Sequence, residues 1–482
     1  MKNINKFIII LVLLATSISC KKFVEGYDKD PNGFLETNTK QIMQGVLLEQ
    51  QFFLKDDGLR LAMIWLNQAT GSDRQFVAFN NWNSVGNNQM NSPWGEVYTV
   101  IGEARLMEQL ADDINNIQAR GLAKLYRAWA GGMAAALWGD VPFSEAGLPE
   151  QYETPKYDPQ ADVFNQVQAL LDDAINDLNN SVGVIYGDKD IYFGGNNQKW
   201  IKVAHGLKAR FYLIMGDYQK AYDEAALGPA SPDDDVIAPY ESYIGPWGKW
   251  NPTFQFYWNR DGYLSAEGAY AAELLMSGAR NDAKTQEYAR AYYNYEDQQW
   301  WNDAAINLNV MIGAWFGVPE MNGKFGGPMS LLTYGEMLLI QTEAKARLDG
   351  NITQALNIYN TYRALLNTGY DTGNWQSIGL PYGYDPYMES DFEPGGSQNP
   401  DNVSKYKAFL REVMEERYIY FIGSLLSYID HSRTYNDPDI LPYFELKTGF
   451  DGAPLRFIYP QSEIDANPNV PKPVPAVTDP LY

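Results

Sequence analysis

The chain has 482 residues, a formal net charge of −23 at pH 7 and a single cysteine. The excess of acidic residues argues against binding to nucleic acid or to anionic lipid headgroups, which would repel such a surface. One cysteine cannot form an intramolecular disulfide, so the stability of the fold must come from a packed core.

The N-terminus has the pattern of a lipoprotein signal. Two lysines precede an apolar run, residues 7–15, that is too short to span a bilayer, and small residues follow it up to Cys20. We expect residues 1–19 to be removed and Cys20 to be lipidated, with residues 20–33 as a charged tether. A buried thiol after an ordinary signal peptide is the less favoured alternative. The acyl chains would anchor the protein to a membrane that it does not cross.

Helical periodicity begins beyond the tether. Apolar residues recur at three- and four-residue steps over 97–114, which predicts an amphipathic helix. Further helices are predicted over about 119–137, where Gly139 and Pro142 supply stop signals, and over 158–178.

Pairs of helices separated by short turns recur later in the chain. The pairs are 200–215 with 218–227 and 331–348 with 352–366, and a last helix is expected at about 406–426. One hairpin of this kind cannot bury its apolar face alone and must stack on its neighbours. The pattern predicts a mainly α fold of tetratricopeptide-like helical hairpins with little β structure, in a single domain over residues 34–482.

Two long segments lack helical periodicity, about 228–327 and 369–402. Loops of this length in a compact protein tend to be functional. The first segment contains Trp300 and Trp301, which are flanked by Gln and Asn, and also Trp315. These segments predict an aromatic, loop-rich ligand-binding region packed against the hairpins.

Trp82 lies between Asn81 and Asn83 in a polar stretch. An indole face with neighbouring amide donors can stack on a sugar ring and bind its hydroxyls. We therefore expect ligand binding at a set of polar-flanked aromatic positions, with core packing as the alternative for each tryptophan. The set is Asn81, Trp82, Asn83, Trp300, Trp301 and Trp315.

Catalytic groups are scarce. The chain has only His205 and His431, both expected to serve packing, and it has no nucleophile-elbow, HExxH or phosphate-loop pattern. A glycosidase pair remains open because two suitably spaced carboxylates suffice. Asp233–Asp235 could bind calcium, but a solvated loop is favoured. We expect no enzyme activity, no cofactor and no metal.

A series of short motifs runs through nearly the whole chain in order. They are Asp30-Pro31-Asn32, Trp94-Gly95-Glu96-Val97-Tyr98, Leu137-Trp138-Gly139-Asp140-Val141-Pro142, Asp190-Ile191-Tyr192-Phe193-Gly194-Gly195, the helix 330–346 with Tyr334 and Glu336, Glu415-Glu416-Arg417-Tyr418, and Arg456-Phe457-Ile458-Tyr459-Pro460. In order and spacing they resemble the SusD/RagB-like outer-membrane nutrient-binding lipoproteins of Bacteroidetes, and in particular the smaller SusD-like branch.

The resemblance implies a mostly helical, tetratricopeptide-like fold with a ligand face built from loops. It implies a lipid-anchored, surface-exposed protein in the outer membrane, with a TonB-dependent (SusC-like) transporter as partner. It also implies ligand contact near Trp82, and core positions for Trp94 and Trp200.

The leading hypothesis is a non-catalytic lipoprotein that captures oligosaccharide and delivers it to that transporter. Peptide is the alternative ligand. A surface glycoside hydrolase and a purely structural lid for the transporter are the other functional classes that remain open.

Overall fold

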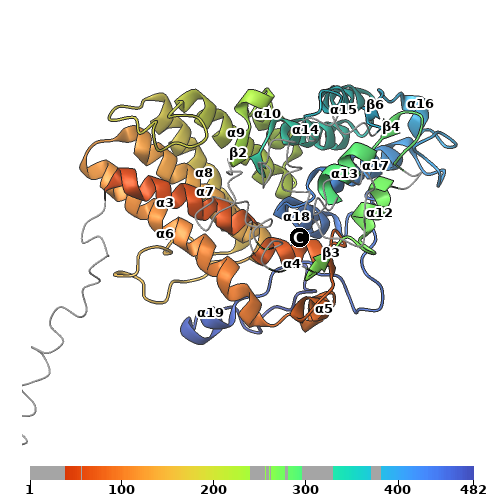
Figure 1. Ribbon diagram of the computed structural model, residues 1–482. Coiled ribbons are helices and arrows are strands. Elements are labelled where there is room, and N and C mark those ends of the chain that lie inside the picture. The colour runs from red at the N-terminus through yellow and green to blue at the C-terminus, as the bar shows by residue number, and fades with distance from the viewer. Residues whose placement is uncertain are drawn as a thin grey trace, which may run out of the picture.

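The computed structural model describes residues 38–55, 57–238, 256, 260, 262–276, 280–295, 329–370 and 381–482 (Figure 1). Helices form most of this part of the chain. They are α3 (Thr39–Lys55), α4 (Asp57–Trp65), α5 (Gln75–Phe79), α6 (Asn91–Asp113), α7 (Ile117–Trp138), α8 (Gln160–Asn179), α9 (Asn197–Ile214), α10 (Tyr218–Ala225), α12 (Tyr270–Met276), α13 (Tyr288–Tyr295), α14 (Tyr334–Asp349), α15 (Thr353–Leu366), α16 (Glu389–Phe392), α17 (Lys405–Tyr420), α18 (Leu425–Thr434) and α19 (Gln461–Ala466).

Short 3-10 turns and three small antiparallel sheets complete the described elements. The turns are η1 (Trp82–Ser84), η2 (Asn87–Met90) and η3 (Pro232–Asp234). The paired strands are β1 (Thr70–Gly71) with β3 (Leu264–Ser265), β2 (Val236–Ala238) with β5 (Met329–Leu332), and β4 (Thr285–Gln286) with β6 (Gly383–Tyr384).

The mainly α prediction is confirmed, and the predicted hairpins correspond to α9 with α10 and α14 with α15. Two expectations need correction. The single helix predicted at about 406–426 is two helices, because Gly423 adopts a φ of +74° and the hydroxyl of Ser424 caps the start of α18. The loop-rich segments also contain the short helices α12, α13 and α16.

Helix α7 is the centre of the larger core, where it packs against α6 and α8 (Figure 1). Two glycines in it, Gly131 and Gly132, let the rings of Phe143 and Phe211 lie directly against the helix backbone. A Cβ atom at either glycine would overlap its ring. Close packing at α7 therefore needs glycine at these two positions.

A second, smaller core lies among α14, α15, α16 and α17, which Figure 1 shows in the other half of the molecule. The two halves are joined by a buried ion pair, in which Arg210 of α9 donates two hydrogen bonds of 2.7 Å to Glu336 of α14. No helix among the described residues is long and apolar enough to cross a bilayer.

The glycines of helices α6 and α7 provide a matched test of this packing. We expect Gly132→Ala to lower thermal stability by about 1–3 kcal/mol, because the new methyl must displace the Phe211 ring. Gly102→Ala in α6 is the control, since its Cβ meets no atom within 4 Å. It should stabilise the protein by up to about 1 kcal/mol. Thermal unfolding followed by circular dichroism measures both, and equal effects would contradict the packing described here.

Candidate functional site

A surface cleft of about 390 Å³ opens between the end of α4, the start of α12 and the loop that follows α18. Its lining residues come from three separate stretches of the chain. They are Asn67, Gly268, Tyr270, Glu273, Glu445, Leu446, Lys447, Thr448 and Phe450. The volume lies within the range of small-molecule sites.

The β1–β3 pairing brings two of these stretches together. Thr70 pairs with Ser265, so Asn67 just before β1 lies beside the turn that follows β3. The amide of Ala271 donates a hydrogen bond of 3.3 Å to the carbonyl of Asn67. The floor of the cleft is therefore set by backbone pairing.

Two aromatic side chains give the cleft apolar surfaces. Tyr270 is half-buried, and its ring centroid lies 6.3 Å from that of buried Tyr418. Phe450 on the opposite stretch meets Trp82 edge-on, with centroids 5.3 Å apart. Partly exposed rings of this kind suit the apolar face of a sugar or of a side chain.

Polar groups accompany the two rings. The side chain of Asn67 is 8% exposed, and its Nδ2 donates to the Glu445 carbonyl at 3.0 Å. Its Oδ1 has no hydrogen-bond partner among the described residues. Glu273 and Glu445 are both exposed. The cleft thus combines apolar rings with an amide oxygen and two carboxylates.

Lys447 is turned away from solvent. Its Nζ donates to the carbonyls of Ala69, at 2.6 Å, and Ile64, at 3.3 Å. Burial lowers the pKa of Lys447 to about 8. Burial and the charges of Glu415 and Glu445 raise the pKa of the Tyr270 hydroxyl to about 12, so this hydroxyl stays neutral and able to donate.

The expectation of an open ring face at Trp82 is wrong in this structure. Trp82 is 1% exposed, because Phe450 packs against it and its Nε1 donates to the carbonyl of Asp451 at 3.0 Å. Asn83 donates to the same carbonyl at 3.2 Å, and Asn81 accepts from the Asn83 amide at 3.1 Å. The Asn81–Asn83 segment therefore supports the cleft wall from behind.

The other predicted positions cannot be placed. Cys20, Trp300, Trp301 and Trp315 lie outside the described residues. All tryptophans within the described residues are buried, which confirms the core positions expected for Trp94 and Trp200. They are Trp65, Trp82, Trp94, Trp129, Trp138 and Trp200.

Sequence reasoning missed the aromatic residues that line the cleft. Tyr270 lies within the loop-rich segment 228–327, where only the tryptophans were singled out. Phe450 follows a glycine in the polar stretch 447–452, a turn signal with an aromatic tip that could have marked it. Nothing in the sequence indicates that these residues meet Asn67.

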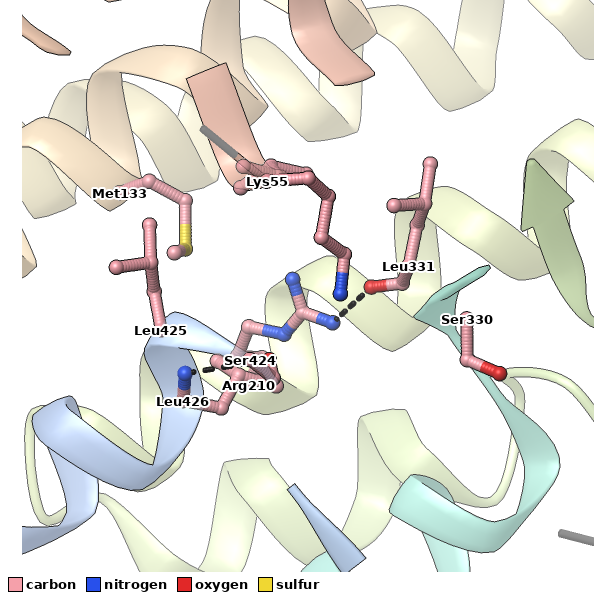
Figure 2. Close-up of a pocket in the computed structure, with 9 residues that line it drawn as sticks. Lys55, Met133, Arg210, Ser330, Leu331, Ser424, Leu425 and Leu426 are labelled. Atoms are coloured by element: carbon pink, nitrogen blue, oxygen red, sulfur yellow. Dashed lines mark hydrogen bonds between the residues drawn. The ribbon is translucent and has the colours of Figure 1, made fainter. Parts of the chain in front are cut away.

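A second cavity is too small for a ligand. It offers only about 10 Å³, room for about one water molecule, between Lys55, Arg210 and Leu331 (Figure 2). Lys55 donates to the carbonyl of Gly423 at 2.9 Å. Burial and the charge of Arg210 lower the pKa of Lys55 to about 7.

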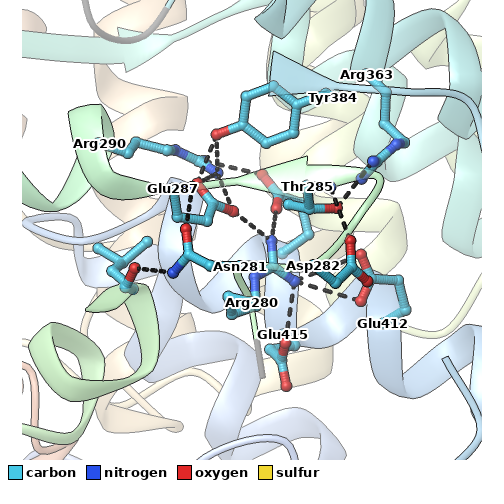
Figure 3. Close-up of polar contacts among 12 residues, drawn as sticks. Arg280, Asn281, Asp282, Thr285, Glu287, Arg290, Arg363, Tyr384, Glu412 and Glu415 are labelled. Carbon is cyan, nitrogen blue, oxygen red and sulfur yellow. Dashed lines mark hydrogen bonds and ion pairs between the residues drawn. The ribbon is translucent and has the colours of Figure 1, made fainter. Parts of the chain in front are cut away.

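A buried ion cluster lies beyond Tyr270. Figure 3 shows the guanidinium of Arg280 among carboxylates of α17 and of Glu287, the residue between β4 and α13. It lies 2.8 Å from Glu287, 3.0 Å from Glu415 and 3.3 Å from Glu412, and it also pairs with Glu416. Arg290 pairs with Glu287 and Glu416 in the same cluster. The charges of Arg363 and Arg411 also act on Glu412 and Glu415.

Burial and unequal contact with the arginines give these carboxyl groups different pKa values. Burial raises the pKa of Glu412, and the neighbouring Glu415 adds to the shift against the opposing charge of Arg280. For Glu416, burial acts in the same direction, but the charges of Arg290 and Arg280 prevail and lower its pKa. Glu412 is therefore the carboxyl of this cluster that takes up a proton most readily.

The remaining polar candidates have structural roles. His431 is 5% exposed and packs edge-on against Tyr435 and Phe444, as expected for a packing histidine. His205 lies 2.6 Å from Glu224. Asp234 pairs with Lys202, while Asp235 accepts from the Tyr370 hydroxyl and the Tyr334 amide. The solvated loop expected at Asp233–Asp235 is thus wrong for these two buried carboxylates.

Comparisons with known proteins agree with this architecture. The SusD-like family model, described as starch-binding and associating with the outer membrane, matches residues 31–367. A SusD/RagB family protein from Bacteroides thetaiotaomicron has a TM-score of 0.64 and 22% identity, over 90% of this chain and 95% of its own. A chitin-binding SusD homologue from Flavobacterium johnsoniae has a TM-score of 0.64 and 15% identity, over 91% and 98%.

A third structure, a SusD homologue from Bacteroides uniformis, has a TM-score of 0.63 and 17% identity, over 91% of this chain and 98% of its own. At these identities the structures establish a shared fold. No curated protein sequence matches the chain.

The ion cluster predicts a specific pH dependence. Because the folded pKa of Glu412 lies above its ordinary value of 4.5, the folded state binds more protons than the unfolded state above pH 4.5. Stability from this group is therefore complete below pH 4.5 and is lost as the pH rises through the folded pKa. We expect Glu412→Gln to remove this pH-dependent loss of stability. The free energy of unfolding of the variant should therefore fall less between pH 4.5 and 7.5 than that of the wild-type protein.

Glu416→Gln is the contrasting variant. Its carboxylate bonds both arginines, so its loss should cost about 3–5 kcal/mol at pH 7. Denaturant unfolding across the pH range measures both variants. Identical pH profiles for wild type and Glu412→Gln would show that Glu412 has the same pKa in the folded and unfolded states, which contradicts the shift described here.

Proposed function

Because this chain belongs to the SusD-like family of outer-membrane-associated proteins, we propose that it is a non-catalytic, lipid-anchored nutrient-binding protein of the cell surface. In this proposal it captures oligosaccharide in the cleft beside Tyr270 and delivers it to a TonB-dependent outer-membrane transporter.

The observation that supports capture is the pairing of aromatic and polar groups in one cleft. Tyr270 and Phe450 provide ring faces, while Asn67 and the two glutamates provide hydrogen-bond acceptors. The Tyr270 hydroxyl provides a neutral donor. Sugars present apolar C–H faces beside hydroxyls, so they fit this combination.

The tryptophans of the loop-rich segment belong to the same proposal. We propose that Trp300, Trp301 and Trp315 add ring faces for a longer oligosaccharide. Asn81, Trp82 and Asn83 are proposed to act at the ligand face through the loop that ends at Asp451, whose carbonyl two of them bond.

Non-catalytic binding agrees with the chemistry of the described residues. His431 is buried among aromatic rings, and burial lowers its pKa to about 3, which is unsuited to proton transfer near neutral pH. A glycoside hydrolase acting in this cleft would need a pair of carboxylates, and Glu273 and Glu445 are the two that line it. The binding experiment below therefore includes a test for hydrolysis.

Calorimetric titration of the full chain in detergent against neutral oligosaccharides and mixed peptides tests the proposal. We expect binding to oligosaccharide, weakened at least about tenfold by Tyr270→Ala or Phe450→Ala through loss of a ring face. Tyr152→Ala is the matched control, because Tyr152 is exposed outside the cleft.

Three outcomes would contradict oligosaccharide capture at this cleft. Binding to peptides alone would change the ligand class. If Tyr152→Ala weakened oligosaccharide binding as much as the cleft variants do, the cleft would not be the binding site. Release of new reducing ends by wild type, abolished by Glu273→Gln or Glu445→Gln, would make the protein a glycoside hydrolase.

Lipid anchoring has its own test at Cys20. Each buried methylene of an acyl chain contributes roughly 0.8 kcal/mol, so the acyl chains would dominate membrane affinity. We expect Cys20→Ser to move the protein from the membrane fraction to the soluble fraction, with the acyl mass absent by mass spectrometry. A variant that stays in the membrane fraction would show that something other than Cys20 holds it there.

A further inference from the structure

The charged side chains that line the cleft favour one class of oligosaccharide. We propose that the cleft selects oligosaccharides that carry free amines, such as glucosamine polymers, over those that carry carboxylates. This inference rests on the oligosaccharide capture proposed above and specifies its chemistry.

Two carboxylates face the ligand space. Glu273 lies in α12, and Glu445 lies on the loop that forms the opposite side of the cleft. Both are exposed, and neither forms an ion pair recorded among the described residues. Glu445 and Tyr270 line the same cleft, and the charge of Glu445 acts on the Tyr270 hydroxyl. A cation above Tyr270 would therefore meet negative charge.

Lys447, the one lysine among the described lining residues, does not neutralise the two carboxylates. The amine of Lys447 donates to the carbonyls of Ala69 and Ile64 beneath the cleft surface. A sugar carboxylate would need that amine to turn outward and leave two backbone carbonyls without their donor. Unpaired buried polar groups are costly, so Lys447 offers little to an anion.

Asn67 supplies a second and independent feature. Its side chain is more than nine-tenths buried, and its Oδ1 has no partner among the described residues. The Nδ2 atom is already committed to the Glu445 carbonyl, so the free end of the amide is an acceptor. An ammonium group has three donors and no acceptor, which complements an amide oxygen in a cleft that two glutamates also line.

The surroundings of the cleft add further negative charge. Glu415, which pairs with Arg280 in the ion cluster, acts electrostatically on Tyr270. The chain as a whole carries a net charge of −23. A polyanionic glycan would be repelled both at a distance and in the cleft.

Calorimetry with three oligosaccharides of equal length tests the inference on the full chain in detergent at pH 6. The probes are oligomers of glucosamine, of N-acetylglucosamine and of galacturonic acid. We expect glucosamine oligomers to bind most tightly and galacturonate oligomers most weakly. Rising salt should weaken glucosamine binding and leave N-acetylglucosamine binding nearly unchanged.

The carboxylates are tested by neutral isosteres. Glu273→Gln and Glu445→Gln should each reduce the preference for glucosamine over N-acetylglucosamine by about twofold to fivefold. Both side chains are exposed, and Asn67 bonds the backbone carbonyl of residue 445, so the fold survives either change. Glu153→Gln, at an exposed glutamate outside the cleft, is the matched control and should leave the preference intact.

The outcomes separate this inference from oligosaccharide capture itself. If all three probes bind equally and the glutamine variants match wild type, charge selection is overturned while capture stands. Tighter binding of galacturonate oligomers also overturns it. If none of the probes and no neutral oligosaccharide binds, capture fails and the inference fails with it.

Discussion

The ion cluster around Arg280 is the interaction on which the C-terminal half of the structure depends. The chain has one cysteine and therefore no internal disulfide, so buried contacts must fix the segment 280–295 against α17. Arg280 does this by pairing with Glu287 of its own segment and with three glutamates of α17. Its loss would leave those carboxylates buried without their counter-charge.

The cluster also reaches the cleft. Glu415 belongs to both environments, because it pairs with Arg280 and acts on the hydroxyl of Tyr270. Tyr270 in turn packs on Tyr418, which lies three residues after Glu415 in α17. The cleft is thus electrostatically coupled to the buried ion cluster, so a change of charge in the cluster affects the pKa of Tyr270.

The helical scaffold could be predicted from sequence because its signals are local. Helix α7 combines apolar periodicity with stop signals at Gly139 and Pro142, and the structure ends it at Trp138. Where a local signal is weak, prediction failed. Apolar periodicity continues through Phe421 and Ile422, so only the positive φ of Gly423 reveals that α17 and α18 are separate helices.

The candidate site could not be predicted because it is assembled by contacts between distant residues. Asn67 and Tyr270 meet through the two-residue strands β1 and β3, which are too short to leave a periodic pattern, and Phe450 joins them from the loop after α18. The position of Trp82 could not be predicted for the same reason. Its polar neighbours suggest an exposed ring, but the loop at Phe450, far along the chain, covers it.

The loop that carries Phe450 is held mainly through its backbone. Asn67 bonds the carbonyl of residue 445, and Trp82 and Asn83 bond that of residue 451. These bonds are indifferent to the side chains at positions 445 and 451. Related genes can therefore exchange the residues at positions 445 and 451 during divergence without losing these bonds, whereas Lys447 and Phe450 anchor the loop through their side chains. A single codon change at position 445 can alter the charge of the cleft while the helical scaffold is inherited unaltered.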